Sequence, residues 1–225
     1  MRLENRGTVC IIGLNGSGKS TLLKTITGII KPKKGQILLD GEDITGLSPH
    51  EILTKGLCFL PQGQTVFPMM TVSENLQMGA YVLRDRNEFK KRLKEACELF
   101  PILEKKRKDL AANLSGGERA MLGIARALMS HPKVMLLDEP SIGLAPNVID
   151  LVYKRLKEIS GEGCSMVIVE QNVRKVLTFA EYAYVLDSGR IKFEGKSETL
   201  QNNERLQSVY LGSFERWKKT KEATN

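Results

Sequence analysis

The sequence lacks any apolar run close to the roughly 20 residues that a helix needs to cross a bilayer. Its longest apolar stretches, residues 9–12, 134–137 and 166–169, have the length of buried strands. The first six residues also lack the apolar core of a signal peptide. We therefore expect no membrane span, and a protein that lies beside the membrane if a membrane is involved.

Cysteine and histidine are scarce. The four cysteines form no CxxC pair, which leaves a zinc ribbon or a thiol redox motif without support. Their wide spacing among apolar neighbours is typical of free thiols in a reducing cytosol. The two histidines, His50 and His131, stand beside prolines in loop-like sequence, and we expect both at the surface.

Acidic residues are fewer than basic ones: 26 Asp and Glu against 34 Lys and Arg leave a net charge of +8. This excess favours an anionic partner, such as nucleic acid, an acidic lipid surface or a phosphorylated ligand, without choosing among them. The basic residues gather at 31–34, 105–108 and 216–219, which we interpret as solvated loop ends and a tail. A chain of 225 residues, 41% of them hydrophobic, fits one large domain or a domain with an inserted subdomain.

Short strand-like runs alternate with helical patterns. The predicted strands are 9–12, 36–39, 57–60, 134–137, 166–169, 184–186 and 191–193. The predicted helices are 19–27, 118–129, 148–159 and 173–180, with a further helical part inserted from 72 to about 108. This alternation favours an α/β fold in which helices cover both faces of a parallel sheet.

A glycine-rich loop follows the first predicted strand. Residues 13–21 read Gly-Leu-Asn-Gly-Ser-Gly-Lys-Ser-Thr, which fits the phosphate-loop pattern GxxxxGK[ST] between a strand and a helix. Its glycines let backbone N–H groups approach phosphate oxygens at the positive end of the helix. Lys19 is expected to reach the β- and γ-phosphates, and the Ser20 hydroxyl to ligate Mg²⁺.

Two adjacent carboxylates, Asp138 and Glu139, end the apolar strand 134–137. Alone, such a pair is more often a turn or a helix cap. Beside a phosphate loop the functional interpretation prevails, because ligands gather at the carboxyl ends of parallel strands. We expect Asp138 to hold the Mg²⁺ shell and Glu139 to polarise an attacking water, since neither histidine lies in suitable sequence.

Residues 114–118, Leu-Ser-Gly-Gly-Glu, precede an Ala- and Leu-rich helix. Ser115 and Glu118 have the spacing of a capping box, which predicts an ordinary helix start. The two glycines would also bare N–H groups at a helix N-terminus, which predicts an anion site. Composition leaves both interpretations open.

Taken together, these motifs resemble the nucleotide-binding subunit of an ATP-binding cassette (ABC) transporter. Residues 13–21 match its Walker A loop, 134–139 its Walker B strand and 114–118 its LSGGE signature, while Gln62 falls where the family has its Q-loop glutamine. The resemblance runs from about residue 7 to 211. It implies a P-loop NTPase fold with a parallel core sheet, a small antiparallel β part shortened at the N-terminus, and an inserted helical subdomain.

The resemblance also implies one domain over 1–225, with an ATP-binding core at 1–64 and 126–225 and a helical signature subdomain at 65–125. Two such domains would pack head to tail, with ATP and Mg²⁺ between the Walker A loop of one and the signature of the other. Glu139 would be the hydrolytic base, and Gln62 would touch Mg²⁺ or water and link the site to the membrane partner. The implied ATP contacts are Gly13, Asn15, Gly16, Ser17, Gly18, Lys19, Ser20, Thr21, Gln62, Ser115, Gly116 and Gly117, and the implied metal contacts are Ser20, Gln62 and Asp138.

Three departures from the family pattern are visible. Gln171 replaces a histidine that contacts the γ-phosphate in many members; a neutral amide donates a hydrogen bond but carries no imidazolium charge. Ala145 stands where an aspartate is common, so coupling through that carboxylate does not carry over. No aromatic residue precedes Phe59, so an adenine-stacking residue is not identified, and the missing strand would leave a sheet edge unpaired.

Segments 61–68, 144–146, 169–173 and 209–212 resemble the branched-chain amino-acid importer subgroup and its LivF-type ATPase, and Gln171 is common there. We therefore expect an ATPase on the cytoplasmic side of the membrane, paired with a second ATPase subunit and permease subunits, and indirectly with a solute-binding protein. The alternatives are a urea-type importer or lipopolysaccharide-export ATPase, a soluble ABC-type ATPase acting on nucleic acid or ribosomes, and a regulatory nucleotide sensor. Chain length disfavours the soluble type, and no nucleic acid is expected.

Overall fold

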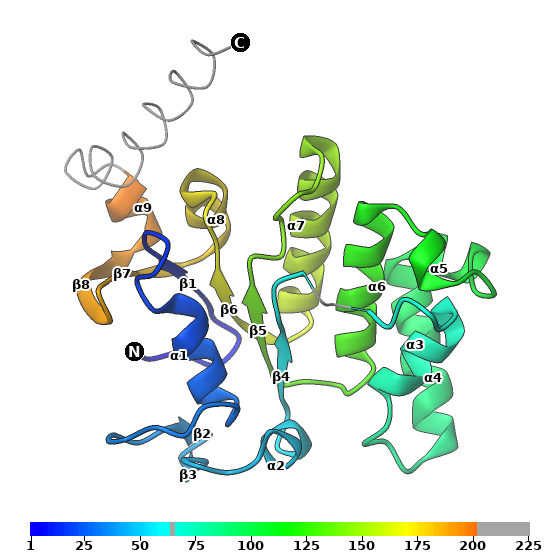
Figure 1. Cartoon of the computed structure of the whole chain (residues 1–225), viewed down its shortest axis with the longest axis horizontal. Helices are drawn as coiled ribbons and strands as arrows, with labels where there is room; N and C mark the ends of the chain where they lie inside the picture. Colours follow the sequence, from blue (N-terminus) through cyan, green and yellow to red (C-terminus); the bar gives the residue numbers. More distant parts are fainter. Residues whose placement is uncertain (64–65, 202–225) are drawn as a thin grey trace.

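The computed structural model describes residues 1–63 and 66–201 of the chain. Its centre is a six-stranded sheet with the order β4-β5-β6-β1-β7-β8 (Figure 1). The strands are β4 (Leu57–Leu60), β5 (Val134–Asp138), β6 (Ser165–Val169), β1 (Thr8–Ile12), β7 (Tyr182–Asp187) and β8 (Arg190–Lys196). The first five pair in parallel, and β8 runs antiparallel to β7. The predicted parallel core is confirmed, while segments 209–212 and 216–219 lie outside the described residues.

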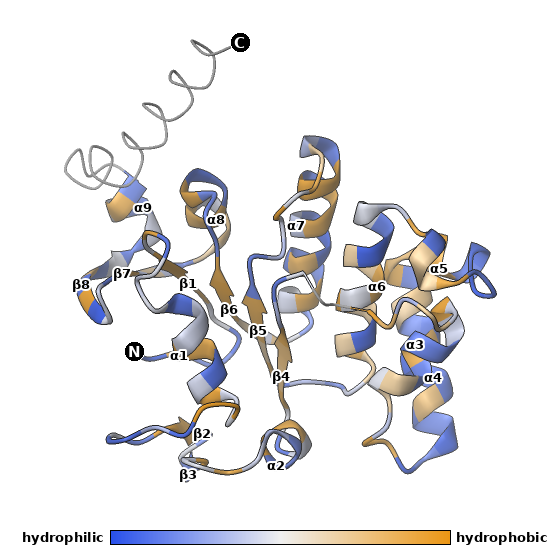
Figure 2. Ribbon diagram, viewed as in Figure 1, coloured by the Kyte–Doolittle hydropathy of each residue, from blue (hydrophilic) through white to orange (hydrophobic). Residues whose placement is uncertain are grey.

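Helices cover both faces of this sheet, as the alternating pattern predicts. They are α1 (Lys19–Ile26), α2 (Pro49–Thr54), α6 (Gly116–Leu128), α7 (Pro146–Gly161) and α8 (Val173–Phe179). Successive strand residues point to opposite faces: Cys10 and Ile12 pack with residues of α6, α7 and α8, whereas Ile11 packs with residues of α1 and α2. All residues of β1 and β6 are therefore buried, and the strands β1, β4, β5 and β6 are strongly apolar (Figure 2).

A helical lobe lies beside β4, at the right of Figure 1. It consists of α3 (Val72–Gly79), α4 (Arg86–Leu99), α5 (Pro101–Lys105), a short 3₁₀ helix (Ala111–Asn113) and α6. Leu76, Ala96, Leu103 and Ile124 each come from a different helix of the lobe and join one buried cluster. The spacing of apolar residues from 72 to 108 thus predicts helices correctly, and α6 brings residues 114–118 to the lobe.

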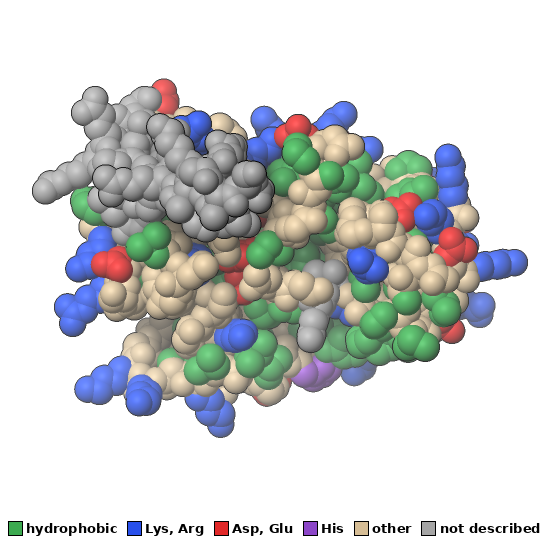
Figure 3. Space-filling model, turned by 45° about the horizontal axis from the view of Figure 1, so that its top comes forward, with side chains coloured by type: hydrophobic (Ala, Val, Ile, Leu, Met, Phe, Trp, Pro, Cys, Tyr) green, Lys and Arg blue, Asp and Glu red, His purple; other side chains and the backbone are tan. Residues whose placement is uncertain are grey.

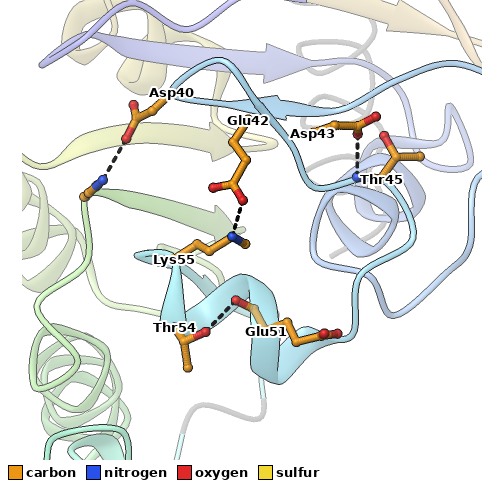
Figure 4. Close-up of polar contacts among 8 residues, drawn as sticks. Asp40, Glu42, Asp43, Thr45, Glu51, Thr54 and Lys55 are labelled. Carbon is orange, nitrogen blue, oxygen red and sulfur yellow. Dashed lines mark hydrogen bonds and ion pairs between the residues drawn. The ribbon is translucent and has the colours of Figure 1, made fainter.

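The small antiparallel part consists of β2 (Leu38–Leu39) and β3 (Glu42–Asp43). Asp40 and Gly41 join them with φ angles of 51° and 82°, as expected for a type I′ hairpin turn. Among the described residues, β2 and β3 pair only with each other. Ion pairs from Lys55 to Glu42 and from Lys133 to Asp40 attach the hairpin to the end of α2 and the start of β5 (Figure 4).

The two histidines and four cysteines lie where the sequence predicts them. His50 and His131 are exposed. All four cysteines are free thiols; Cys10 and Cys164 are buried, and the other two are partly buried. Helices α2 and α9 (Ser197–Gln201) are additions to the predicted elements.

Candidate nucleotide-binding site

The phosphate loop joins β1 to α1, and two of its glycines are required by geometry. Gly18 has a φ of 102°, a left-handed conformation that L-residues rarely adopt, directly before α1. A Cβ at Gly13 would lie 2.2 Å from the carbonyl oxygen of Leu186. Asn15, Gly16 and Thr21 are exposed, so this loop leaves polar groups open to a ligand.

Lys19 is buried within the loop, at 5% exposure. Its Nζ donates hydrogen bonds to the carbonyl oxygens of Gly13 (2.8 Å) and Leu14 (3.0 Å). Burial lowers the pKa of Lys19, while the charges of Glu139 and Asp138 act in the opposite direction. The amino group is therefore near both carboxylates and is held by carbonyl groups that a phosphate could replace.

Two buried polar atoms beside these groups have no partner among the described residues: the Ser17 hydroxyl and Oδ1 of Asp138. Buried polar atoms in folded proteins nearly always have a partner. No group of three or more His, Cys, Asp or Glu that could hold a metal occurs in the described part of the chain. The Asp138 carboxylate and the Ser20 hydroxyl, at the start of α1 beside the phosphate loop, suit Mg²⁺, which commonly keeps waters and substrate phosphates as its other ligands. The residues present thus fit a nucleotide with Mg²⁺.

Glu139 stands directly after β5, where three neighbouring strands end. Gln62, which follows β4, donates from Nε2 to its Oε2 at 2.8 Å. Gln171, which follows β6, donates from Nε2 to both carboxylate oxygens at 2.8 Å. Glu139 has a φ of 52°, and its N–H donates to the carbonyl of Val169. The sheet therefore brings these three predicted residues into direct contact, around a carboxylate that could accept a proton.

Ser115, Gly116 and Gly117 begin α6 and lie in the helical lobe. The Ser115 hydroxyl accepts from the N–H of Glu118 (3.2 Å), and the Ser115 N–H donates to the Glu118 carboxylate (2.8 Å). The capping box is therefore present. Among hydrogen bonds and ion pairs of the described residues, none joins these three residues to the loop 13–21.

Gly116 nevertheless faces the site. It lines a cavity of about 260 Å³ together with Asp138, Glu139 and the loop that follows them. A Cβ at Gly116 would meet nothing within 4 Å, whereas one at Gly117 would lie 2.7 Å from Val148. Ala145 precedes α7 and provides no side-chain cap to it.

Sequence reasoning missed one buried acid at this edge of the sheet. Glu170 directly follows β6 and is 2% exposed, next to Gln171. It stands after its apolar strand as Asp138 stands at the end of its own, and this parallel is the signal that could have found it. Ser141, two residues beyond Glu139, is also buried and contacts Glu170.

The model of the protein family described as ABC transporter matches residues 1–142 of this chain. The branched-chain amino acid transport protein BraG of Pseudomonas aeruginosa is 41% identical over 91% of this chain and 87% of its own length. The probable LivF of Archaeoglobus fulgidus is 38% identical over 93% and 89%. The lipopolysaccharide export protein LptB of Haemophilus influenzae is 37% identical over 94% and 88%.

Solved structures agree. The ADP conformation of the ATP-binding cassette MJ1267 has a TM-score of 0.83 and 28% identity, over 94% of this chain and 90% of that one. A dimeric cassette, MJ0796 bound to ADP and phosphate, has a TM-score of 0.77 and 26% identity, over 88% of both chains. The fold, the phosphate loop and these relatives together show that this chain belongs to the ABC transporter ATP-binding family.

Proposed function

We propose that this chain is the ATP-hydrolysing subunit of an ABC importer for branched-chain or other hydrophobic amino acids. The observation that carries the hydrolytic part is the carboxylate of Glu139, held by the amides of Gln62 and Gln171 near Lys19. The solute class rests on BraG and LivF, at 41% and 38% identity.

ATP binding would use the phosphate loop. The N–H groups of residues 13–21 and the start of α1 face the phosphates, and the Lys19 amino group exchanges its loop carbonyls for β- and γ-phosphate oxygens. Ser20, Asp138 and Gln62 would hold Mg²⁺, which when bound neutralises charge on the phosphate oxygens. The remaining loop contacts are Gly13, Asn15, Gly16, Ser17, Gly18 and Thr21.

Hydrolysis would depend mainly on positioning and electrostatics. Glu139 accepts a proton from the attacking water, the water oxygen bonds to the γ-phosphorus, and the bond from that phosphorus to the bridging oxygen of ADP breaks. Gln62 and Gln171 hold Glu139 and orient the water. Gln171 stays neutral at every physiological pH, so it contributes hydrogen bonds without a titrating charge.

A second ATPase subunit would complete each site with its own Ser115, Gly116 and Gly117, whose helix start offers N–H groups to the γ-phosphate. A permease would dock on the helical lobe. Exposed apolar side chains gather there, on the right of Figure 3, and they include Phe67, Met69, Met78 and Tyr81. The division into a core at 1–64 and 126–225 and a signature subdomain at 65–125 is part of this proposal.

No helix of the described residues could span a membrane. We place the protein at the cytoplasmic face of the membrane, bound peripherally through permease subunits and linked through them to a solute-binding protein. LptB, at 37% identity, makes lipopolysaccharide export the second candidate.

Glu139→Gln tests the hydrolytic role. The amide keeps the size of the side chain but is a far weaker base, so ATP turnover should fall roughly 10²- to 10⁴-fold while ATP affinity is retained. Phosphate release and nucleotide titration measure the two quantities. Glu158→Gln, on the outer part of α7, is the matched control and should turn over ATP at the wild-type rate. Unchanged turnover in Glu139→Gln would remove the residue from the role of base.

Reconstitution tests the solute. The chain, co-purified with permease subunits, is placed in vesicles with the solute-binding protein. Branched-chain amino acids should stimulate ATP turnover. Stimulation by lipopolysaccharide instead would favour the second candidate.

A further inference from the structure

Glu170 is a buried carboxylate that the proposed reaction does not use. It is 2% exposed and lies between the loop after β5 and the loop after β6. No ion pair of the described residues includes it. A buried carboxylate without a cation is costly, so its hydrogen-bond partners decide what it does.

Those partners come from both loops. The N–H of Ser141 donates to Oε1 of Glu170 at 3.0 Å, and the N–H of Gln171 donates to Oε2 at 3.2 Å. One oxygen thus holds the chain two residues beyond Glu139. The other holds the residue whose amide contacts Glu139. Each flank of the Glu139–Gln171 contact is fastened to the same carboxylate.

The surroundings of Glu170 come from three further elements. The Tyr153 hydroxyl of α7 lies beside it; burial raises the pKa of Tyr153, and the charge and hydrogen bonding of Glu170 raise it further. Cys10 of β1 also faces Tyr153, and Lys175 of α8 lies over the Tyr153 ring. Burial raises the pKa of Glu170, and smaller effects in the opposite direction come from the hydroxyl and N–H of Ser141, the Tyr153 hydroxyl and the N–H of Asn172.

We propose that Glu170 is a positioning residue, whose two carboxylate oxygens fasten the loop after Glu139 to the loop that carries Gln171 and so fix the base against its amide partner. This inference rests on the proposed hydrolytic function. It assigns Glu170 no contact with ATP or water. Its effect passes through the geometry of Glu139 and Gln171.

The ionised form is required because both N–H groups are donors. A carboxylate accepts from both, whereas a glutamine amide has one acceptor oxygen and turns an NH₂ group toward the second donor. Glu170→Gln should therefore release one loop. It also removes a buried charge, so the folded protein should be no less stable than wild type. Loss of function without loss of stability separates positioning from a structural role.

The test measures kcat, KM and unfolding by urea for Glu170→Gln in the full chain. We expect kcat to fall roughly 10- to 100-fold, because small displacements of a catalytic group cost that much. KM and the urea midpoint should stay unchanged. Glu158→Gln makes the same chemical change in a half-exposed residue of α7 and should match wild type in all three. Glu170→Asp keeps both acceptors on a shorter stem and should recover part of kcat.

A double-mutant cycle with Gln171→Ala completes the test. If Glu170 acts through Gln171, the loss in the double variant should be smaller than the product of the single losses. Wild-type kcat in Glu170→Gln, or fully multiplicative losses, would overturn the inference while leaving ATP hydrolysis by Glu139 intact. A wild-type protein without ATP turnover would instead overturn the proposed function itself.

Discussion

At the scale of a single residue, two opposing effects act on the pKa of Lys19. Burial lowers its pKa, and the nearby charges of Glu139 and Asp138 raise it. Its hydrogen bonds to two loop carbonyls keep the amino group inside the loop. Such a group can exchange one set of oxygen partners for another at little structural cost, which suits a residue that binds phosphate.

Lys19→Ala should weaken ATP binding. A hydrogen bond to a charged group contributes about 1.5–3 kcal/mol, which corresponds to roughly 10- to 150-fold in affinity. Titration with a fluorescent ATP analogue measures the change. Lys24→Ala, an exposed residue of the same helix, is the control and should bind normally. Wild-type affinity in Lys19→Ala would contradict the phosphate-loop interpretation.

At the scale of elements, one capping geometry occurs at three helix starts. The side chains of Ser48, Thr71 and Ser115 each accept from the N–H of the glutamate three residues on, and the carboxylate of that glutamate accepts from the N–H of the capping residue. Only the cap of α6 is followed by two glycines, one of which faces the cavity beside Glu139. The capping and anion-binding interpretations of residues 114–118 are thus separable by comparing like caps.

Ser115→Ala and Thr71→Ala provide that comparison. Loss of either cap should lower the free energy of unfolding by about 0.5–2 kcal/mol, because one helix N–H loses its partner. Urea unfolding measures this. Only Ser115→Ala should also slow ATP turnover, since only the helix start that Ser115 caps is proposed to face the γ-phosphate. Equal turnover in the two variants would leave Ser115 with the capping role alone.

The strands of the core could be predicted well, because a strand buried on both faces is a continuous apolar run bounded by polar residues. Residues 134–137 and 166–169 each agree with the observed strand to within one residue. Helix α2 is harder to predict, because its six residues are too few to show a helical periodicity. Ser48 and Glu51 nevertheless have capping-box spacing. Short pieces of structure depend on packing that a local pattern does not contain.

The residues of the candidate site also differ in how far the sequence predicts them. Lys19, Asp138 and Glu139 follow from local patterns, and Gln62 and Gln171 from resemblance. Their mutual contact depends on β4, β5 and β6 being neighbours, which the order of elements along the chain does not specify. The role of Glu170 could not be predicted from the sequence, because a single acidic residue after a strand has many possible roles. Only the fold shows that the N–H of Ser141 donates to its carboxylate.

At the scale of the whole molecule, residues 115–117 lie on the lobe and no described contact joins them to the loop 13–21 of their own chain. In the proposed dimer, a second copy of the chain supplies residues 115–117 to the site. Mixing two deficient variants tests this. Lys19→Ala and Ser115→Ala dimers each carry two damaged sites, whereas a mixed dimer has one intact site.

A one-to-one mixture of these variants should therefore recover ATP turnover, toward roughly a quarter of the wild-type rate if dimers form at random between identical copies. Phosphate release after re-equilibration measures it. Each variant alone at the same total concentration is the control. Turnover that stays at the mean of the two variants would exclude sites shared between copies of this chain.

Because the backbone of Glu139 is left-handed, substitution by glycine affects stability and activity in opposite directions. A non-glycine residue in that conformation stores strain of order 1–3 kcal/mol, which the surrounding hydrogen bonds must offset. Replacement by glycine would relieve the strain and remove the base together. Stability and activity are thus opposed at this position, and an active enzyme has to be maintained against a more relaxed, inactive alternative.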